Sequence, residues 1–386
     1  MSTSFTRLRH DLHKYPELSG QESATAQRII KELSLTAPNR VLTALTGSRT
    51  GVCAEFVASN DGPTIMFRCE LDALPIQEKN KFEYRSKNEG VAHLCGHDGH
   101  MATLLHVAHS LKKKPIARGR VLLLFQPAEE TGVGAKGMVE DLVFKKFGKP
   151  DAIYAFHNVP EYENGCVLIK QGTMTMASVG FLVKIIGETS HASYPNDARN
   201  PTKSLARLVL ELENTANYNS SDFISSTYAT ITGAQLGLSA NRLEPSFGTT
   251  PGDAWISGTL RSHIDRDLEK LRNLLTEKVN CEAKNSQLQF NVSWHEYFPA
   301  TKNHETEVNK VIAVAQSLNI PVKILDEPFR WSEDFAYYTQ NFPGAFFGLG
   351  AGCDHVQLHD STYDFPDPLI QTGGSLYRGL IDSYLS

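Results

Sequence analysis

The sequence predicts an α/β protein in which one domain is interrupted by a smaller α+β domain. Its 386 residues exceed what a single hydrophobic core usually organises, so two domains are expected. Residues 1–175 and 298–386 alternate helix-like and strand-like segments, which is typical of a sheet covered by helices. Residues 176–297 follow the order β-α-β-β-α-β, which is that of a ferredoxin-like unit. We therefore expect a discontinuous first domain with the second inserted into it.

Composition and charge are those of an ordinary globular protein. Hydrophobic residues make up 41% and charged residues 21% of the chain, and the formal net charge is −5. This balance gives no indication of a nucleic-acid partner. No apolar run approaches membrane-spanning length and the first residues lack an apolar signal core, so we expect a cytoplasmic protein without a membrane partner. The six cysteines are widely spaced, which favours reduced thiols over a disulfide framework.

Short patterns near the N-terminus predict the first elements. Apolar residues at helical spacing over 5–12 predict a helix that ends before Pro16. Ser19 and Glu22 have the spacing of a capping box and predict the start of a second helix. Two strand-like runs follow, at 51–57 and 64–68.

Acidic residues follow the second of these runs. Glu70 and Asp72 come just past an apolar strand, where open α/β sheets place their functional sites. On this pattern alone, capping of a turn explains the two carboxylates equally well.

Residues 93–100, with the sequence HLCGHDGH, place one thiol and three imidazoles in a single loop. Cys95 and His97 are two positions apart, so on an extended segment their side chains leave from the same side. Asp98 suits the N-cap of the helix that the apolar spacing of 101–111 predicts. Thiolate and imidazole on a loop held by a helix suit a transition metal. The alternative is a polar surface loop that is rich in histidine by chance.

Two further segments place metal-ligating residue types near the ends of strands. The continuous apolar run 121–125 predicts a central strand buried on both faces, and Glu129 and Glu130 follow it. Adjacent buried carboxylates require a positive partner, which a metal would supply. A strand over 152–156 then leads to His157, which on its own is as well explained as a structural histidine.

After residue 176 the pattern changes. Residues 181–185 alternate between apolar and other residues, and a loop with His191 follows. The remaining elements predicted for this domain are a helix from 201 to 212, strands at 227–236 and 253–262, a helix over 268–279 and a strand at 288–294. Alternating α/β then resumes with a helix over 304–318, a strand at 322–325, a helix over 333–340, a strand at 344–349, a loop with His359 and a last helix from 370.

Six motifs occur in order along the chain: RHDLHKYPE (9–17), DALP (72–75), CGHDGH (95–100), QPAEE (126–130), HASYP (191–195) and LH (358–359). Together they resemble the M20 metallopeptidase family, and within it the amidohydrolase branch, subfamily D. That branch includes N-acyl-amino-acid amidohydrolases, hippurate hydrolases and plant hormone-conjugate hydrolases. The resemblance covers essentially the whole chain. It implies a catalytic α/β domain with a zinc-peptidase-like mixed sheet (1–175 and 298–386), interrupted by an α+β ferredoxin-like lid and dimerisation domain (176–297).

The resemblance also implies roles for individual residues. The ligands of a two-metal centre would be Cys95, His97, Glu130, His157 and His359. Glu129 would be the general base, and Asp72 matches the acidic residue that supports the metal site. His191, on the lid, would reach the scissile carbonyl oxygen or the substrate carboxylate. Asn241 and Arg261 stand where family members place lid groups that meet the substrate.

The activity implied by the resemblance is hydrolysis of the amide bond of N-acyl amino acids, with an acetyl, benzoyl or similar acyl group. The products would be a carboxylic acid and a free amino acid, formed by a metal-activated water with Glu129 as general base. Thiolate and imidazole ligands favour zinc, but availability decides as much as affinity, so we expect zinc or manganese, with cobalt and nickel as alternatives. The expected partners are this small-molecule substrate and a second copy of the chain, bound through the lid.

Three other functions compete with this one. A metallo-aminopeptidase or dipeptidase would use the same two-metal centre. A closed structural zinc site would leave no need for the free member of the pair Glu129 and Glu130. A non-catalytic binding protein on the same fold would not need Glu129 at all. The chain also departs from the family pattern at Glu70, where the family usually has aspartate, and at 188–190 and 241–245 on the lid.

Overall fold

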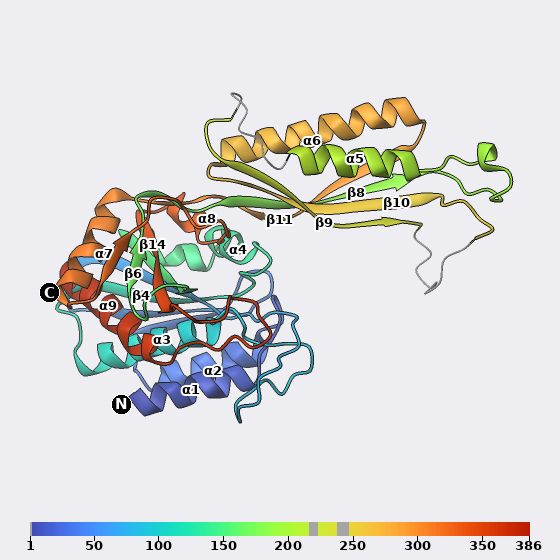
Figure 1. Ribbon diagram of the computed structural model, residues 1–386. Coiled ribbons are helices and arrows are strands. Elements are labelled where there is room, and N and C mark those ends of the chain that lie inside the picture. The colour runs from blue at the N-terminus through green and yellow to red at the C-terminus, as the bar shows by residue number, and fades with distance from the viewer. Residues whose placement is uncertain (1, 216–222, 238–246) are drawn as a thin grey trace. The chain divides into compact units, whose positions relative to one another are not determined.

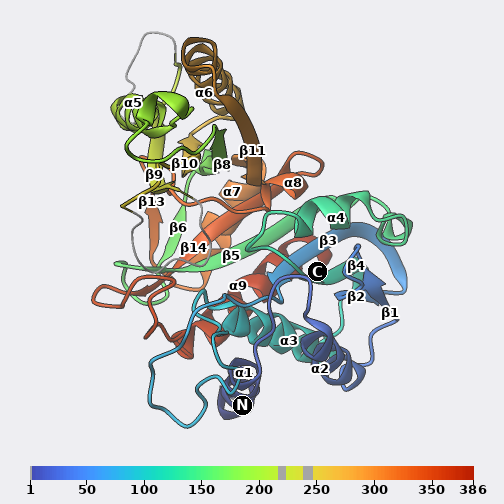
Figure 2. The ribbon, with the colours of Figure 1, turned by 90° about the vertical axis from the view of Figure 1, so that its right-hand side faces the viewer.

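The computed structural model describes residues 2–215, 223–237 and 247–386 (Figure 1, Figure 2). The chain divides into two compact units. The first consists of Met1–Met174, Thr301–Pro328 and Glu333–Ser386, and the second of Thr175–Ala300 and Phe329–Ser332. Asn241, which the sequence suggested as a substrate-binding residue, lies outside the described residues.

An eight-stranded mixed sheet forms the centre of the first unit. Its strands are β1 (Arg40–Leu45), β2 (Gly51–Val57), β3 (Asn60–Glu70), β4 (Arg118–Gln126), β5 (Ala152–Pro160), β6 (Val167–Ile169), β13 (Val322–Ile324) and β14 (Gly344–Gly352). Their order across the sheet is β1-β2-β4-β3-β5-β14-β6-β13. The four central strands, β4, β3, β5 and β14, pair in parallel, whereas β1–β2, β2–β4 and β14–β6 pair antiparallel. The mixed α/β fold that the sequence predicts is therefore confirmed.

The apolar run in β4 forms a central strand because both of its faces are covered. Val121, Leu123 and Phe125 belong to a core shared with helices on one side of the sheet. Leu122 and Leu124 alternate with them and are equally buried, at 0% exposure, so they face the opposite side. A run without polar positions is what a strand with two buried faces requires.

Five helices of the first unit contribute to one apolar core. They are α1 (Ser2–Lys14), α2 (Ser23–Ser34), α3 (His97–Lys113), α7 (Glu305–Ser317) and α9 (Pro368–Leu385). Of these, α1, α2 and α3 lie together on one face of the sheet (Figure 2). The other elements of this unit are α4 (Gly134–Glu140), α8 (Ala336–Thr339), a short 3-10 helix (Phe144–Phe147) and a two-stranded sheet of β7 (Gly172–Thr175) and β12 (Thr301–Asn303). Within the described ranges, no helix has the length and apolar character needed to cross a membrane.

Two expected helix caps are wrong. Ser19 does not cap α2, since its hydroxyl donates instead to Asp72 Oδ2 at 2.7 Å. Glu22 is itself the residue before the helix, and its side chain reaches another loop. Asp98 lies inside the first turn of α3, which follows Gly96, and its carboxylate binds Arg9 and His13. In each case a tertiary contact outcompetes the local capping bond.

The second unit is built on a four-stranded antiparallel sheet with the order β11-β8-β10-β9. The elements are β8 (Ala177–Ile186), a short 3-10 helix (Pro195–Asp197), α5 (Thr202–Thr215), β9 (Thr227–Leu236), β10 (Asp253–Ser262), α6 (Asp265–Ser286) and β11 (Gln289–Phe298). α5 and α6 lie on one face of this sheet (Figure 1). The sheet is half-buried, because β10 alternates strictly between buried and partly exposed residues along its length.

Candidate metal centre

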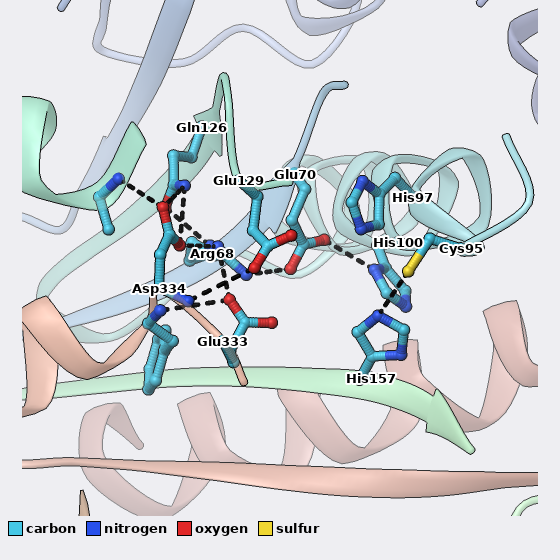
Figure 3. Close-up of polar contacts among 12 residues, drawn as sticks. Arg68, Glu70, Cys95, His97, His100, Gln126, Glu129, His157, Glu333 and Asp334 are labelled. Carbon is cyan, nitrogen blue, oxygen red and sulfur yellow. Dashed lines mark hydrogen bonds and ion pairs between the residues drawn. The ribbon is translucent and has the colours of Figure 1, made fainter. Parts of the chain in front are cut away.

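Sulfur and imidazole groups of the first unit meet at the start of α3 (Figure 3). Cys95 and His97 flank Gly96, which takes a left-handed conformation with φ of 94°. A Cβ at Gly96 would lie 2.4 Å from Asn158 Oδ1, so the loop requires glycine here. His157 approaches from β5, which continues past it, whereas the sequence pattern ended the strand at this residue. The two segments that carry these predicted ligands are thus fixed by a helix and a central strand.

The two glutamates predicted to follow β4 lie in a tight turn. Ala128 takes a positive φ of 54°, which is uncommon for a residue with a side chain. The turn is closed by hydrogen bonds from Gly134 N to Ala128 O, at 3.0 Å, and from Gly132 N to Glu129 O, at 2.7 Å. Glu129 is buried, and Glu130 is partly buried. The turn therefore carries two adjacent carboxylates into the same region as Cys95 and His97.

All five predicted metal ligands take part in close groups of donor atoms. The groups are Cys95–His97–His157, Cys95–Glu130–His359 and His97–Glu129–Glu130, and within each group the donor atoms lie within 4.8 Å of one another. The separations include 3.3 Å from Cys95 Sγ to His157 Nε2, 3.8 Å from His97 Nε2 to Glu130 Oε1 and 3.9 Å from His359 Nε2 to Glu130 Oε2. Donor atoms around a tetrahedral zinc ion lie about 3.3–3.8 Å apart, given bonds of about 2.0–2.3 Å. The separations are thus compatible with metal ions.

Backbone carbonyls orient two of the imidazoles. His97 Nδ1 lies 2.9 Å from Asp72 O, and His157 Nδ1 lies 2.9 Å from Asn158 O. A ring that donates from Nδ1 presents Nε2 as an acceptor, which is the usual arrangement of a metal-binding histidine. Asp72 also fixes Glu130, because Asp72 Oδ2 accepts the Glu130 N–H at 3.0 Å. Asp72 therefore contacts two of the five predicted ligands.

The charges at this site fit a cation. Burial raises the pKa of the Cys95 thiol well above its usual range, and burial raises the pKa of Glu130 to about 7. Burial also lowers the pKa of His157, which keeps the imidazole neutral and able to bind a metal. Among the described residues, His97 Nε2 and Glu130 Oε1 are buried atoms without a hydrogen-bond partner. A divalent cation bound here would offset the charge of the buried acids and would give the unpaired nitrogen and oxygen atoms a partner.

A second set of buried charges, the Arg68 cluster (Arg68, Glu70, Glu333 and Asp334), lies beside Glu129 (Figure 3). The Arg68 guanidinium pairs with Glu70, with Glu333 Oε1 at 2.9 Å and with Asp334 Oδ1 at 2.5 Å. Glu129 Oε1 accepts the Asp334 N–H at 3.4 Å. Burial and the carboxylates of Glu333, Glu130 and Asp334 together raise the pKa of Glu129 well above its usual range. These surroundings favour the protonated form of the Glu129 carboxyl.

Sequence reasoning missed the Arg68 cluster. Glu333 and Asp334 appeared as the beginning of a helix over 333–340, but the helix starts only at Ala336. A usable signal was present, because Arg68 interrupts an otherwise apolar strand and a buried arginine needs carboxylate partners. The strand alone could not reveal which acids those were.

His359 reaches the site from a strained position. Its φ is 67°, in the left-handed region, and its N–H donates to Leu94 O at 2.9 Å. Strain of this kind persists where surrounding contacts fix the backbone, and it concentrates at functional sites. Because Leu94 directly precedes Cys95, this hydrogen bond joins the His359 backbone to the loop that carries Cys95. Its imidazole is half exposed, at 49%, unlike those of His97 and His157.

The lid residues that the sequence suggested belong to the second unit. His191 lies in an exposed loop, where its Nδ1 accepts the Ser193 N–H at 3.1 Å. Arg261 lies in β10 and donates to Arg330 O and to Ser332 Oγ, at 3.0 and 3.1 Å. Neither residue belongs to the groups of donor atoms in the first unit.

Known proteins match most of the chain. Residues 66–383 match the family model for Peptidase family M20/M25/M40. The chain is 33% identical over 385 residues to the N-acetyl-L-cysteine deacetylase of Bacillus subtilis (strain 168), covering 97% of this chain and 88% of that protein. It is 30% identical over 388 residues to the hippurate hydrolase of Campylobacter jejuni, covering 99% of this chain and 96% of that one. The solved structure of a dinuclear metal-binding peptidase of the M20 family from Bacillus subtilis matches with a TM-score of 0.79 and 27% identity, over 98% of this chain and 97% of that chain.

Proposed function

The chain belongs to peptidase family M20/M25/M40, and from this premise we propose that it is a metal-dependent amidohydrolase acting on N-acyl amino acids. The observation that carries the proposal is the meeting of thiol, imidazole and carboxylate donors beside the buried carboxyl of Glu129. The names of the relatives support the substrate class, since one is a deacetylase of N-acetyl-L-cysteine and another a hippurate hydrolase. The products would be a carboxylic acid and a free amino acid.

Five residues would hold two divalent cations: Cys95, His97, Glu130, His157 and His359. Bound there, the cations would polarise the acyl carbonyl and would lower the pKa of a water to near neutral pH. We propose zinc or manganese, with cobalt and nickel as alternatives, because the donor set is soft to borderline and availability decides between such metals. Asp72 would maintain the geometry by holding His97 and Glu130.

Glu129 would act as general base and then as general acid. Its carboxylate would accept a proton from the attacking water and pass the proton to the nitrogen of the leaving amino acid. The contacts that support this role are its burial and its surrounding carboxylates, which favour the protonated form between the two transfers. The backbone N–H of Asp334 contacts one oxygen and leaves the other for the reaction.

We propose that the second unit is the inserted ferredoxin-like lid, covering 176–297. Its order of elements and its sheet topology support this assignment. His191 would meet the scissile carbonyl oxygen or the substrate carboxylate, and Asn241 and Arg261 would contact the substrate. Among the described strands, β9 and β11 form the edges of the four-stranded sheet, and an available edge supports homodimerisation through this unit. The six cysteines, all in described positions, are free thiols, which supports a reducing compartment such as the cytoplasm.

A substrate panel tests the proposed function. The protein is loaded with Mn²⁺ or Zn²⁺ and assayed with N-acetyl and N-benzoyl amino acids and with unblocked dipeptides. We expect release of the amino acid from the acylated substrates and much slower cleavage of the dipeptides. Cleavage of dipeptides alone would support the aminopeptidase or dipeptidase alternative, which the relatives named above do not favour. Hydrolysis of neither class after loading would support a non-catalytic binding protein.

A further inference from the structure

The turn that carries Glu129 is strained at the residue before it. Ala128 has a φ of 54°, and the left-handed region is unfavourable for alanine because its Cβ crowds the following carbonyl. Ala128 is also buried, so its N–H needs a partner inside the protein. Something must therefore hold this residue in place, and the side chain that does so determines the direction in which Glu129 leaves the backbone.

That partner is Glu22, a carboxylate from a distant part of the chain. Glu22 Oε1 accepts the Ala128 N–H at 2.8 Å across 106 positions in sequence. The same oxygen accepts the Gly20 N–H, and Oε2 accepts the Thr50 hydroxyl, both at 2.8 Å. Glu22 has 0% exposure, so water does not compete for these bonds. The hydrogen bonds of this buried carboxylate join three loops and hold them in position.

A second carboxylate holds the other end of the same turn. Asp72 Oδ2 accepts the Glu130 N–H at 3.0 Å, and Asp72 O contacts His97. The carboxylates of Glu22 and Asp72 thus each hold one end of the turn. Asp72 fixes the predicted ligand Glu130, whereas Glu22 fixes the residue that precedes the base.

We propose that Glu22 is a positioning residue for Glu129: its buried carboxylate holds Ala128 in the left-handed conformation and thereby sets the direction of the catalytic carboxylate. The proposal rests on the proposed function, in which Glu129 is the base. The Glu22 carboxylate accepts hydrogen bonds from Gly20, Thr50 and Ala128, none of which is a predicted ligand, so its effect on Glu129 would pass through the turn.

The test compares three variants of the full-length, metal-loaded protein. Glu22→Ala removes the acceptor. Glu22→Gln keeps an acceptor oxygen, while its amide can donate to the Thr50 hydroxyl. Glu17→Ala is the matched control, because Glu17 binds Ala24 N and Thr25 N at the start of the same helix but does not reach the turn. Each variant is measured for kcat and KM on an N-acyl amino acid, for bound metal, and for amide hydrogen exchange in peptides covering 127–134.

We expect Glu22→Ala to lower kcat about 10- to 100-fold with little change in KM, which is the usual effect of losing an outer support of an active site. Exchange in 127–134 should accelerate, and bound metal should stay the same because Asp72 still holds Glu130. Glu22→Gln and Glu17→Ala should keep the parent kcat and the parent exchange of the turn. In an Ala128→Gly background the loss of kcat caused by Glu22→Ala should shrink at least about threefold, since glycine needs no help to adopt this φ.

Either of two results with the alanine variants would overturn the proposal. One is a Glu22→Ala protein with unchanged kcat or unchanged exchange in the turn. The other is a Glu17→Ala protein with the same losses, which would indicate general destabilisation of α2. If Glu22→Ala does not fold, Thr50→Val removes only the donor to Oε2, and it should shift kcat and exchange in the same directions by smaller factors; no shift in either would overturn the proposal. Failure of the proposed function is recognised separately, because Glu129→Gln would then keep full turnover whatever the exchange data show.

Discussion

The Nε2 atom of His157 lies 3.3 Å from the Sγ atom of Cys95, although 62 positions separate the two residues in the sequence. His157 is fixed by the central strand β5, and Cys95 by the loop that opens α3. The side-chain amide of Asn158 joins these two elements, because it donates to Cys95 O at 3.0 Å. The sheet and the helix therefore set the distance together, and the pair is a pre-formed part of the candidate centre.

Replacing Cys95 with alanine should lower the amount of bound metal. Cys95 belongs to two of the three groups of donor atoms that contain at least two predicted ligands, so its loss weakens both. We expect fewer bound ions per chain, by elemental analysis after dialysis, and a fall in kcat/KM of at least about 100-fold. Cys69→Ala is the control, since Cys69 is a buried thiol outside these groups. Retention of the parent metal content by Cys95→Ala would show that this thiol is not a ligand.

Glu129→Gln should abolish most of the activity without releasing metal. The amide cannot accept the proton of the attacking water, and removal of a general base costs about 10²–10⁴-fold in kcat. Glu130→Gln should behave differently, because Glu130 faces His97 and His359 and its loss should lower metal content as well as activity. Parallel measurements of kcat and bound metal on both variants separate the two roles. Full turnover by metal-loaded Glu129→Gln would exclude Glu129 as the base.

The sequence could predict the fold class and the donor residues because both are encoded locally. The apolar run 121–125 identifies a strand buried on two faces, and the structure confirms it as part of β4. Cys95 and His97 are close in sequence, so the shape of one loop determines their separation. Glu130 follows β4 and His157 lies in the second half of β5, and the carboxyl ends of such parallel strands are where α/β sheets place their sites.

The supporting contacts could not be predicted, because they join residues that are far apart in the chain. Arg68 and Asp334 are separated by 266 positions, and no local pattern links them. Glu22 was misassigned for a related reason. Its spacing from Ser19 fits a capping box, but the buried N–H of Ala128 binds its carboxylate instead. Local capping contributes about 0.5–2 kcal/mol, so an unpaired buried donor of about 1–3 kcal/mol can override it.

Arg68→Met should destabilise the protein strongly. The substitution leaves Glu70, Glu333 and Asp334 buried without their guanidinium, and breaking a buried ion pair costs about 3–5 kcal/mol. Urea unfolding of the metal-free protein measures this loss. Arg40→Met is the control, because the Arg40 side chain is 41% exposed and Glu55 keeps a second ion pair with Arg120, so the loss should be about 0–1 kcal/mol. Equal losses of unfolding free energy in the two variants would mean that the buried Arg68 cluster stabilises the protein no more than the Arg40 ion pair does.

His13 should make the stability of the protein depend on pH. Burial opposes its protonation, but hydrogen bonds and the charges of Asp98 and Glu78 outweigh burial and raise its pKa to about 9. An unfolded histidine has a pKa of about 6.5, so the folded protein holds this proton more tightly. The stabilisation, up to about 3 kcal/mol, should be complete below about pH 6.5 and should disappear as the pH rises through about 9.

Urea unfolding of the metal-free protein and of His13→Gln, measured from pH 6 to pH 9.5, tests the direction of this pH dependence. The gap in unfolding free energy between the two should narrow as the pH rises. His109→Gln provides the opposite case, because burial lowers the pKa of His109 and its contribution should instead be lost as the pH falls. A gap for His13→Gln that is constant over this range would mean that His13 is not protonated in the folded state. A neutral imidazole carries one N–H, so His13 could then donate to only one of Asp98 and Glu78.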